Sequence, residues 1–444
     1  MKIVFIKPNI GCKDERPYFD SCAMQPLTIA VLVGLTPPGH DVVFYDDRVE
    51  DIPYDRPADL VGITAETYTA KRAYDIASQY RRRGVKVVLG GFHPTLAPEE
   101  ASEYADAVAI GEAEDLWPAI VEDAGKGRLK KFYKSEKRPS LAGLKPAREI
   151  FKGKKYLPVN LVEFGRGCRN SCEFCAVAAF FKSTHSHRPV GEVISEIKSI
   201  GSRNIFFIDD NIISDIESAK NLFRELIPLK IRWIGQAGID LVEDEELLKL
   251  AAESGCTGLV IGLETLSRNN LSIMNKSWNL GSGGYAYALK KIKEYGIVVW
   301  AAFMFGYKND DKALFDRTFE FSMEQKCAFL AVNHLMPYPG TKLYEDLSEQ
   351  GRLIYKKWWI DERYRFGDIC FNPDSMSAGE LREQSYRLRR RFYSFRSISY
   401  RILDRKANGK DMFNITAFLK YNYLFRKELF KKKGMKFGAA REIS

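Results

Sequence analysis

The strongest constraint on the fold is an alternation of short apolar runs with helix-length segments, which occurs twice along the 444 residues. Strands that are separated by helices pair in parallel, so each run predicts an α/β domain. The first run has strand candidates at 2–8, 41–46, 60–64, 86–89 and 107–110. It predicts a doubly wound parallel sheet over residues 1–127.

The alternation restarts after a charged, proline-containing stretch at 128–158, which is interpreted as a surface linker. Strand candidates then follow at 161–164, 204–208, 232–236, 258–262, 298–305 and 329–335. Six β/α units of this spacing predict a partial barrel over residues 159–345. Residues 346–444 become irregular, then helical and basic, and are predicted to form a C-terminal extension.

Three cysteines, Cys168, Cys172 and Cys175, lie within eight residues directly after the first strand of the second run. In barrel folds, the loops after the strands build the chemical site. A [4Fe–4S] cluster normally takes four cysteines. Three close cysteines can hold three irons of such a cubane and leave the fourth open to an external ligand. A zinc site, completed by His185 or His187, is the alternative.

The Cys-x3-Cys-x2-Cys spacing resembles the radical S-adenosylmethionine (SAM) superfamily. Further stretches resemble the branch of that superfamily with a cobalamin-binding domain. The resemblance implies a [4Fe–4S] cluster on the three cysteines and SAM across the strand ends. It places SAM near the residues Asp209, Asp210, Asn211, Gln236 and Glu264, because carboxylates pair well with an ammonium group. Asp-Asp-Asn can equally cap the next helix.

The first domain resembles a cobalamin-binding domain through Thr64 and the adjacent Gly90 and Gly91, which follow two strands. Glycines at a strand end let the backbone lie flat against a large group. The resemblance implies cobalamin on these three residues. The loop 9–24 contains no histidine, so we expect no histidine ligand to cobalt. A domain that has lost cobalamin is the alternative, and His93 is expected to be a core or loop residue.

The basic charge is concentrated in the tail. Residues 381–444 hold 18 Lys/Arg and 5 Asp/Glu, a net +13, whereas the whole chain carries +10. Nucleic acid is therefore a less expected partner. The tail interleaves arginines with aromatics, which predicts either helices packed on the barrel or peripheral contact with an anionic membrane. No secretory signal or membrane span is predicted, and a cytoplasmic location is expected.

The resemblance implies an enzyme that reductively cleaves SAM and, with cobalamin, methylates an unactivated carbon of a small or lipid-like metabolite. It also implies a one-electron donor of the flavodoxin or ferredoxin type. Two alternatives stay open: radical cyclisation or rearrangement without methyl transfer, and RNA methylthiolation. Six side chains are expected to line an apolar substrate pocket: Trp300, Phe303, Met304, Tyr338, Trp358 and Trp359.

Overall fold

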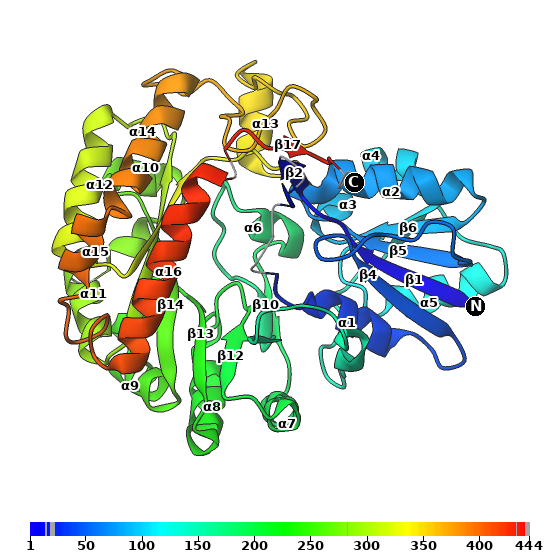
Figure 1. Cartoon of the computed structure of the whole chain (residues 1–444), viewed down its shortest axis with the longest axis horizontal. Coiled ribbons are helices and arrows are strands. Elements are labelled where there is room, and N and C mark those ends of the chain that lie inside the picture. The colour runs from blue at the N-terminus through cyan, green and yellow to red at the C-terminus, as the bar shows by residue number, and fades with distance from the viewer. Residues whose placement is uncertain (14–15, 18–22, 282, 432, 440–444) are drawn as a thin grey trace.

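The computed structural model describes residues 1–13, 16–17, 23–281, 283–431 and 433–439. Cys22 and Lys432 lie outside the described residues. Two α/β halves stand side by side, each built on its own six-stranded sheet, and helix α6 lies between them (Figure 1). The predicted fold class, with two parallel sheets and a helical C-terminal extension, is confirmed.

The first sheet has the strand order β4-β1-β5-β6-β7-β8, and all its pairings are parallel. Side chains alternate along β1: Ile3 and Phe5 pack in one core, whereas Val4 and Ile6 pack in another on the opposite face. Both faces are therefore covered, as in doubly wound sheets. The elements are β1 (Lys2–Lys7), α1 (Leu27–Leu35), β4 (Asp41–Asp46), β5 (Leu60–Thr64), η1 (Thr67–Thr69), α2 (Ala70–Arg82), β6 (Lys86–Gly90), α3 (Phe92–Leu96), α4 (Pro98–Tyr104), β7 (Ala107–Ile110), α5 (Leu116–Gly125) and β8 (Phe132–Lys134).

The stretch interpreted as a linker contributes to this sheet. β8 pairs with β7 in parallel and adds a sixth strand beyond the five expected from the sequence. Tyr133, at its centre, packs in the core and donates to Asp123 on α5. A three-residue strand between charged residues has too short an apolar pattern to be predicted from sequence.

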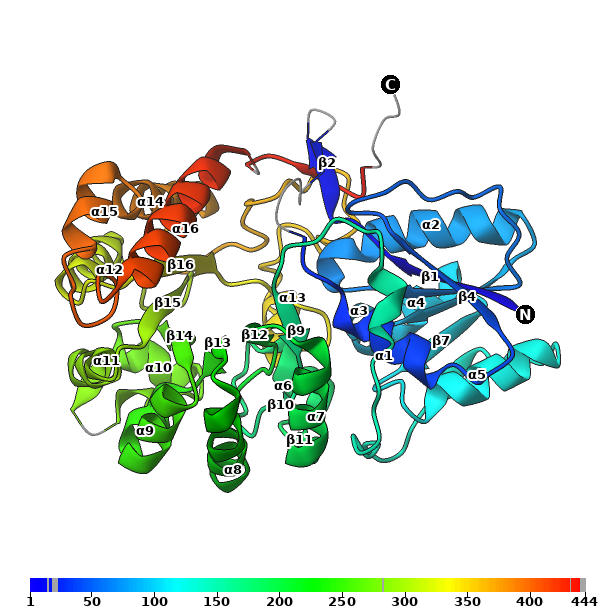
Figure 2. The same ribbon diagram turned by 60° about the horizontal axis from the view of Figure 1, so that its bottom comes forward.

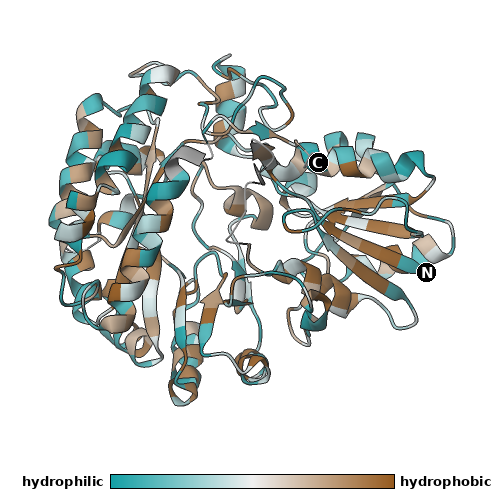
Figure 3. Cartoon of the chain, in the orientation of Figure 1, coloured by the Kyte–Doolittle hydropathy of each residue, from teal (hydrophilic) through white to brown (hydrophobic). Residues whose placement is uncertain are grey.

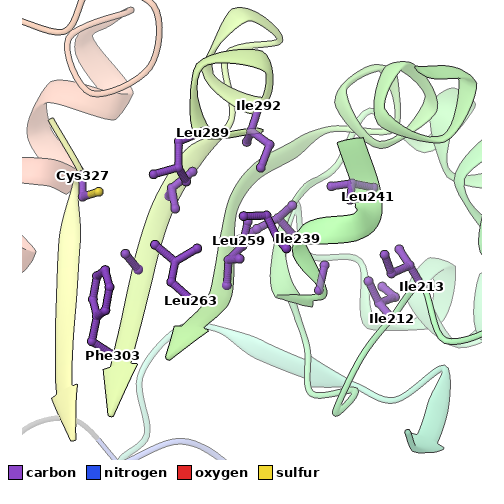
Figure 4. Close-up of a cluster of buried hydrophobic side chains, with 14 of the residues drawn as sticks. Ile212, Ile213, Ile239, Leu241, Leu259, Leu263, Leu289, Ile292, Phe303 and Cys327 are labelled. Carbon is purple, nitrogen blue, oxygen red and sulfur yellow. The ribbon is translucent and has the colours of Figure 1, made fainter. Parts of the chain in front are cut away.

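The second sheet has the order β16-β15-β14-β13-β12-β9, again entirely parallel, with helices on its outer face. The outer core is almost wholly aliphatic, as Figure 4 shows for Leu259, Leu263, Leu289 and Ile292. The elements are β9 (Asn160–Val162), α7 (Val190–Ile200), β12 (Asn204–Phe207), α8 (Ile216–Leu226), η3 (Ile227–Leu229), β13 (Arg232–Ala237), η4 (Ile239–Glu243), α9 (Glu245–Glu253), β14 (Cys256–Glu264), α10 (Arg268–Ile273), η5 (Ser277–Leu280), α11 (Gly284–Glu294), β15 (Val298–Phe305), α12 (Lys312–Glu324) and β16 (Phe329–His334).

The segment between β9 and α7 carries a hairpin that the sequence did not predict. β10 (Gly165–Gly167) and β11 (His185–His187) pair antiparallel, and α6 (Ala176–Phe181) lies between them in the chain. Gly167 has φ +81, and a Cβ there would lie 2.2 Å from the carbonyl oxygen of Thr184. The glycine therefore allows the hairpin strands to approach closely.

The C-terminal extension packs on the barrel and then returns to the first half. Helices α14 (Ala378–Phe392), α15 (Phe395–Arg401) and α16 (Met412–Lys431) follow α13 (Lys342–Glu349) and cover α12 and the β16 edge (Figure 1). β17 (Lys436–Phe437) then pairs with β2 (Gly11–Lys13), which also pairs with β3 (Arg16–Pro17) (Figure 2). The C-terminal segment thus connects the two halves.

The surface of the extension is mixed in polarity. Figure 3 shows apolar and hydrophilic residues interleaved along α14 and α16. Phe392 and Phe418 are buried and Phe425 packs against Trp300, whereas Phe395 and Leu403 are exposed. Within the described part of the chain, none of the helices combines the length and apolar character needed to span a bilayer.

Candidate functional site

The three cysteines lie on the loop that leads from β10 into α6. All three thiols are free and half-buried. The N–H of Cys175 donates to the carbonyl of Cys172 at 3.1 Å, and Cys175 is the residue that begins α6. The loop therefore turns back on itself and brings the ends of the motif together.

The electrostatics of the thiols confirm that they share a small volume. Burial raises the pKa of Cys172 to about 11, and the neighbouring Cys175 and Cys168 act in the same direction, against Lys276. Burial also raises the pKa of Cys175. Among the described residues, no three His, Cys, Asp or Glu side chains converge on one metal position. A cubane fits this arrangement better than zinc because each sulfur binds a different iron.

The residues that end β12 hold the cysteine loop. Asp209 accepts hydrogen bonds from the N–H groups of Phe164 (3.1 Å) and Gly165 (2.5 Å). Asp210 accepts from the N–H of Gly167 at 2.8 Å. The amide of Asn211 lies 3.9 Å from the sulfur of Cys168. These three predicted SAM contacts therefore fix the loop from below, and burial raises the pKa of Asp209 to about 8.

Gln236 and Glu264, the other predicted SAM contacts, lie at the ends of β13 and β14. The Gln236 amide donates to the carbonyl of Asp209 at 3.4 Å. Glu264 forms a buried ion pair with Lys276 at 2.6 Å. Burial lowers the pKa of Lys276, but Glu264, Cys172 and Cys175 outweigh it and raise that pKa overall. The ion pair therefore lies beside the cysteines.

Lys276 is a residue that the sequence did not single out. It lies in the loop after α10, where Asn275 donates to the hydroxyl of Ser171 in the cysteine loop at 2.7 Å. This contact docks the loop and brings Lys276 to Glu264. No local pattern marks a single lysine in a polar loop, so only the fold could reveal it.

A cavity of about 290 Å³ lies at the carboxyl ends of β5, β6 and β7. All three predicted cobalamin residues, Thr64, Gly90 and Gly91, line it. Its floor is apolar and includes Phe5, Val31, Gly62, Val88, Ala109 and Trp117. The same cavity reaches Arg166 and Asp210 of the second half.

Gly91 keeps the rim of this cavity open. Its φ of +102 belongs to a region that side-chain-bearing residues rarely adopt. A Cβ there would also lie 2.8 Å from the carbonyl oxygen of Ala65. An apolar slot with a flat, glycine-lined edge fits the bulky nucleotide tail and macrocycle of cobalamin.

A buried ionic network joins the cobalamin-binding-like half to the cysteine loop. Arg166, two residues before Cys168, pairs with Glu114 at 2.5 Å and with Glu163 at 2.7 Å. Arg138 pairs with Glu112 at 2.7 Å in the same network. His93 is fully buried and contacts Tyr74 and Glu100, so it is a core residue, as expected.

A second cavity, of about 320 Å³, lies beside Phe174 of the cysteine loop. Of the six side chains expected to line a substrate pocket, only Met304 and Tyr338 do so. Phe303 belongs instead to the barrel core (Figure 4). Trp358 and Trp359 are also core residues, and Trp300 packs under α16 against Phe425. Aromatics on strands alternate between core and cavity, which composition alone cannot resolve.

Comparison with known families agrees with both halves. The pattern of the Radical SAM superfamily matches residues 162–321, and that of the B12 binding domain matches residues 24–121. Two similar curated proteins come from Chlorobaculum tepidum. Bacteriochlorophyllide d C-12(1)-methyltransferase is 28% identical over 88% of this chain and 87% of its own length. Bacteriochlorophyllide d C-8(2)-methyltransferase is 29% identical over 80% of this chain and 83% of its own length.

A solved structure shares the architecture. The radical SAM methyltransferase TsrM from Kitasatospora setae, with cobalamin and a [4Fe–4S] cluster bound, superposes with a TM-score of 0.63 at 17% identity. The match covers 86% of this chain and 84% of TsrM. The chain therefore belongs to the radical SAM superfamily, in its branch with a cobalamin-binding domain, and its cofactors are a [4Fe–4S] cluster, SAM and cobalamin.

Proposed function

We propose that this enzyme transfers a methyl group to an unactivated carbon of a small or lipid-like metabolite. The observation that carries the proposal is the first cavity, which runs from Thr64, Gly90 and Gly91 to Arg166 and Asp210. A group bound there lies against the strand and hairpin that support the cysteine loop. The curated relatives, which methylate carbon positions named in their titles, support the same reaction class.

In this proposal Cys168, Cys172 and Cys175 hold the cluster, and Thr64, Gly90 and Gly91 line the cobalamin site. When bound, the cluster and SAM supply hydrogen abstraction from carbon, and cobalamin supplies a transferable methyl group. Asp210, Asn211, Gln236 and Glu264 are proposed SAM contacts.

The chain's own contribution is position and exclusion of water. Asp209 holds the backbone of the cysteine loop through two amide hydrogen bonds, and through that loop it sets the position of SAM. The Lys276 ammonium lies beside Cys172 and Glu264, where it balances the negative charge that thiolates bring. Phe174 and Tyr338 provide an apolar wall that keeps solvent from the reacting carbon.

The proposal is tested by anaerobic purification, reconstitution with iron, sulfide and cobalamin, and product analysis with a reductant and candidate substrates. Methyl transfer predicts a product heavier by one methyl group, together with S-adenosylhomocysteine and 5′-deoxyadenosine. A product of unchanged carbon count without S-adenosylhomocysteine would instead favour cyclisation or rearrangement. Absence of 5′-deoxyadenosine from a fully reconstituted sample would overturn the radical assignment.

The cluster assignment is tested separately with Cys172→Ala. We expect loss of the cluster's visible absorbance and of 5′-deoxyadenosine formation, with an unchanged circular dichroism spectrum. The matched control is Cys256→Ala, because Cys256 is a buried free thiol on β14. If Cys172→Ala kept the full iron content and 5′-deoxyadenosine yield, the cluster would have other ligands.

We further propose that the extension contacts an anionic membrane surface. Phe395, Leu403 and Met412 are 63%, 64% and 74% exposed, and they lie among lysines and arginines. Apolar side chains flanked by cations bind interfaces that carry anionic lipid. Wild-type protein is expected to sediment with vesicles containing phosphatidylglycerol and not with phosphatidylcholine alone. A Phe395→Gln/Leu403→Gln double variant should stay in the supernatant; equal sedimentation of both proteins would contradict the proposal.

A further inference from the structure

The second cavity is assembled from parts of the chain that are far apart in sequence. The barrel contributes Met304 from β15 and His334 from the end of β16. The cysteine loop contributes Phe174, the first half contributes Tyr68, and the C-terminal helix α14 contributes Arg389. Because Phe174 lies between Cys172 and Cys175, a molecule in this cavity lies next to the cluster loop.

The walls favour a flat, apolar ligand. Phe174, Met304, Met336 and Phe366 present apolar surface, and the ring of Tyr68 lies 6.0 Å from that of Tyr338 in an edge-on arrangement. Aromatic and thioether groups pack well against the faces and edges of planar molecules. A cavity with this lining gains most from a ligand whose body is aromatic or conjugated.

The cavity also carries a single permanent charge. Arg389 is the only lysine or arginine among the described residues that line it, and none of those residues is Asp or Glu. The Nε of Arg389 donates to the carbonyl of Val332 at 3.0 Å, which fixes the guanidinium at the end of β16. Burial and the neighbouring Arg389 lower the pKa of His334 to about 3, so His334 adds no second charge at neutral pH.

We propose that this cavity binds the substrate, and that the substrate is a flat, largely apolar molecule with one oxyanion, a carboxylate or a phosphate, held by Arg389. The inference rests on the proposed function and adds to it the class of substrate. A guanidinium recognises either oxyanion through paired N–H donors. The oxyanion then fixes which edge of the flat body faces the cluster loop.

Equilibrium dialysis of the reconstituted holoprotein with three probes tests this. The probes share one flat body: 1-pyrenecarboxylate, 1-pyrenemethyl phosphate and the neutral 1-pyrenemethanol. At least one anion is expected to bind about 10-fold more tightly than the alcohol, the gain typical of a charge-assisted hydrogen bond. The stronger anion then identifies the oxyanion as carboxylate or phosphate.

The matched variants are Arg389→Gln and Arg387→Gln, two residues apart on α14; Arg387 is exposed and does not line the cavity. Arg389→Gln should bring all three probes within about twofold of one another, while Arg389→Lys retains part of the preference. Arg387→Gln should behave as wild type. Equal binding of anions and alcohol to the wild type, or equal effects of the two Gln variants, would overturn the inference.

The same samples separate the two levels of the argument. Formation of 5′-deoxyadenosine with reductant and SAM reports the proposed radical function without any substrate. If it forms but the anion preference is missing, only the substrate inference fails. If it does not form, the proposed function itself fails, whatever the probes do.

Discussion

Glu264 and Lys276 show what single residues reveal that patterns do not. Glu264 follows a strand and could be singled out because polar residues at strand ends build sites. Its partner comes from a loop that has no motif, and the pairing depends on Asn275 docking against Ser171. The three cysteines, by contrast, could be identified directly because their spacing is itself the chemical requirement.

We predict that Lys276→Met destabilises the protein by about 3–5 kcal/mol, because it leaves Glu264 as an unpaired buried charge. Adding Glu264→Gln should recover most of the loss, since the double variant buries no charge. Urea unfolding of the apoprotein measures both, with the exposed Lys290→Met as control. If the double variant were no more stable than Lys276→Met, the two side chains would not be coupled.

Among the elements, long periodic strands and helices could be predicted, and short ones could not. Strands β4, β5, β7 and β15 have the bounds expected from their apolar runs. The hairpin β10–β11 and helix α3 escaped prediction because tertiary contacts and glycine geometry define them, and neither has a helical or alternating pattern. These short elements border the candidate site.

The turn between β6 and α3 gives a prediction at this scale. Gly91→Ala should destabilise the first half by about 1–3 kcal/mol, because the new Cβ meets the Ala65 carbonyl in a strained conformation. It should also weaken cobalamin binding, measured by absorbance after gel filtration. Gly125→Ala, at the end of α5, is the control and should be neutral or stabilising. Unchanged cobalamin content in Gly91→Ala would place the cofactor elsewhere.

For the whole molecule, the sequence indicated two α/β halves and a helical extension, but not how they are joined. The contacts that join them are long-range: Trp359 and Lys357 of the extension both reach Glu100 on α4. Trp359 and Trp358 were expected in a substrate pocket, yet they form the core between extension and first half. Pairings across some 260 residues leave no trace in local periodicity.

Glu100 makes the stability of this junction depend on pH. Burial alone would raise the pKa of Glu100, but hydrogen bonds from His93, Trp359 and Lys357 lower it to about 2. The ordinary value is 4.5, so the ionised form stabilises the folded state above pH 4.5, by roughly 3 kcal/mol. This contribution is lost as the pH falls from about 4.5 to about 2.

We therefore expect Glu100→Gln to lower the urea midpoint of the apoprotein at neutral pH. The variant should also lose stability less steeply than wild type between pH 4.5 and 2. Glu99→Gln, on the same helix but exposed, should retain the wild-type profile. Parallel pH profiles for wild type and Glu100→Gln would show that this carboxylate does not control the junction.

The pairing of β17 with β2 also sets an order of events during synthesis. The strand partner of Gly11 is Phe437, so a ribosome must deliver almost the entire polypeptide before the loop after β1 can settle. Domains otherwise tend to fold as they emerge, N-terminal first. The first half can thus collapse early while its edge beside the cofactor slot stays open. Cobalamin then has an entry route throughout translation, and the last residues to be made fasten it shut.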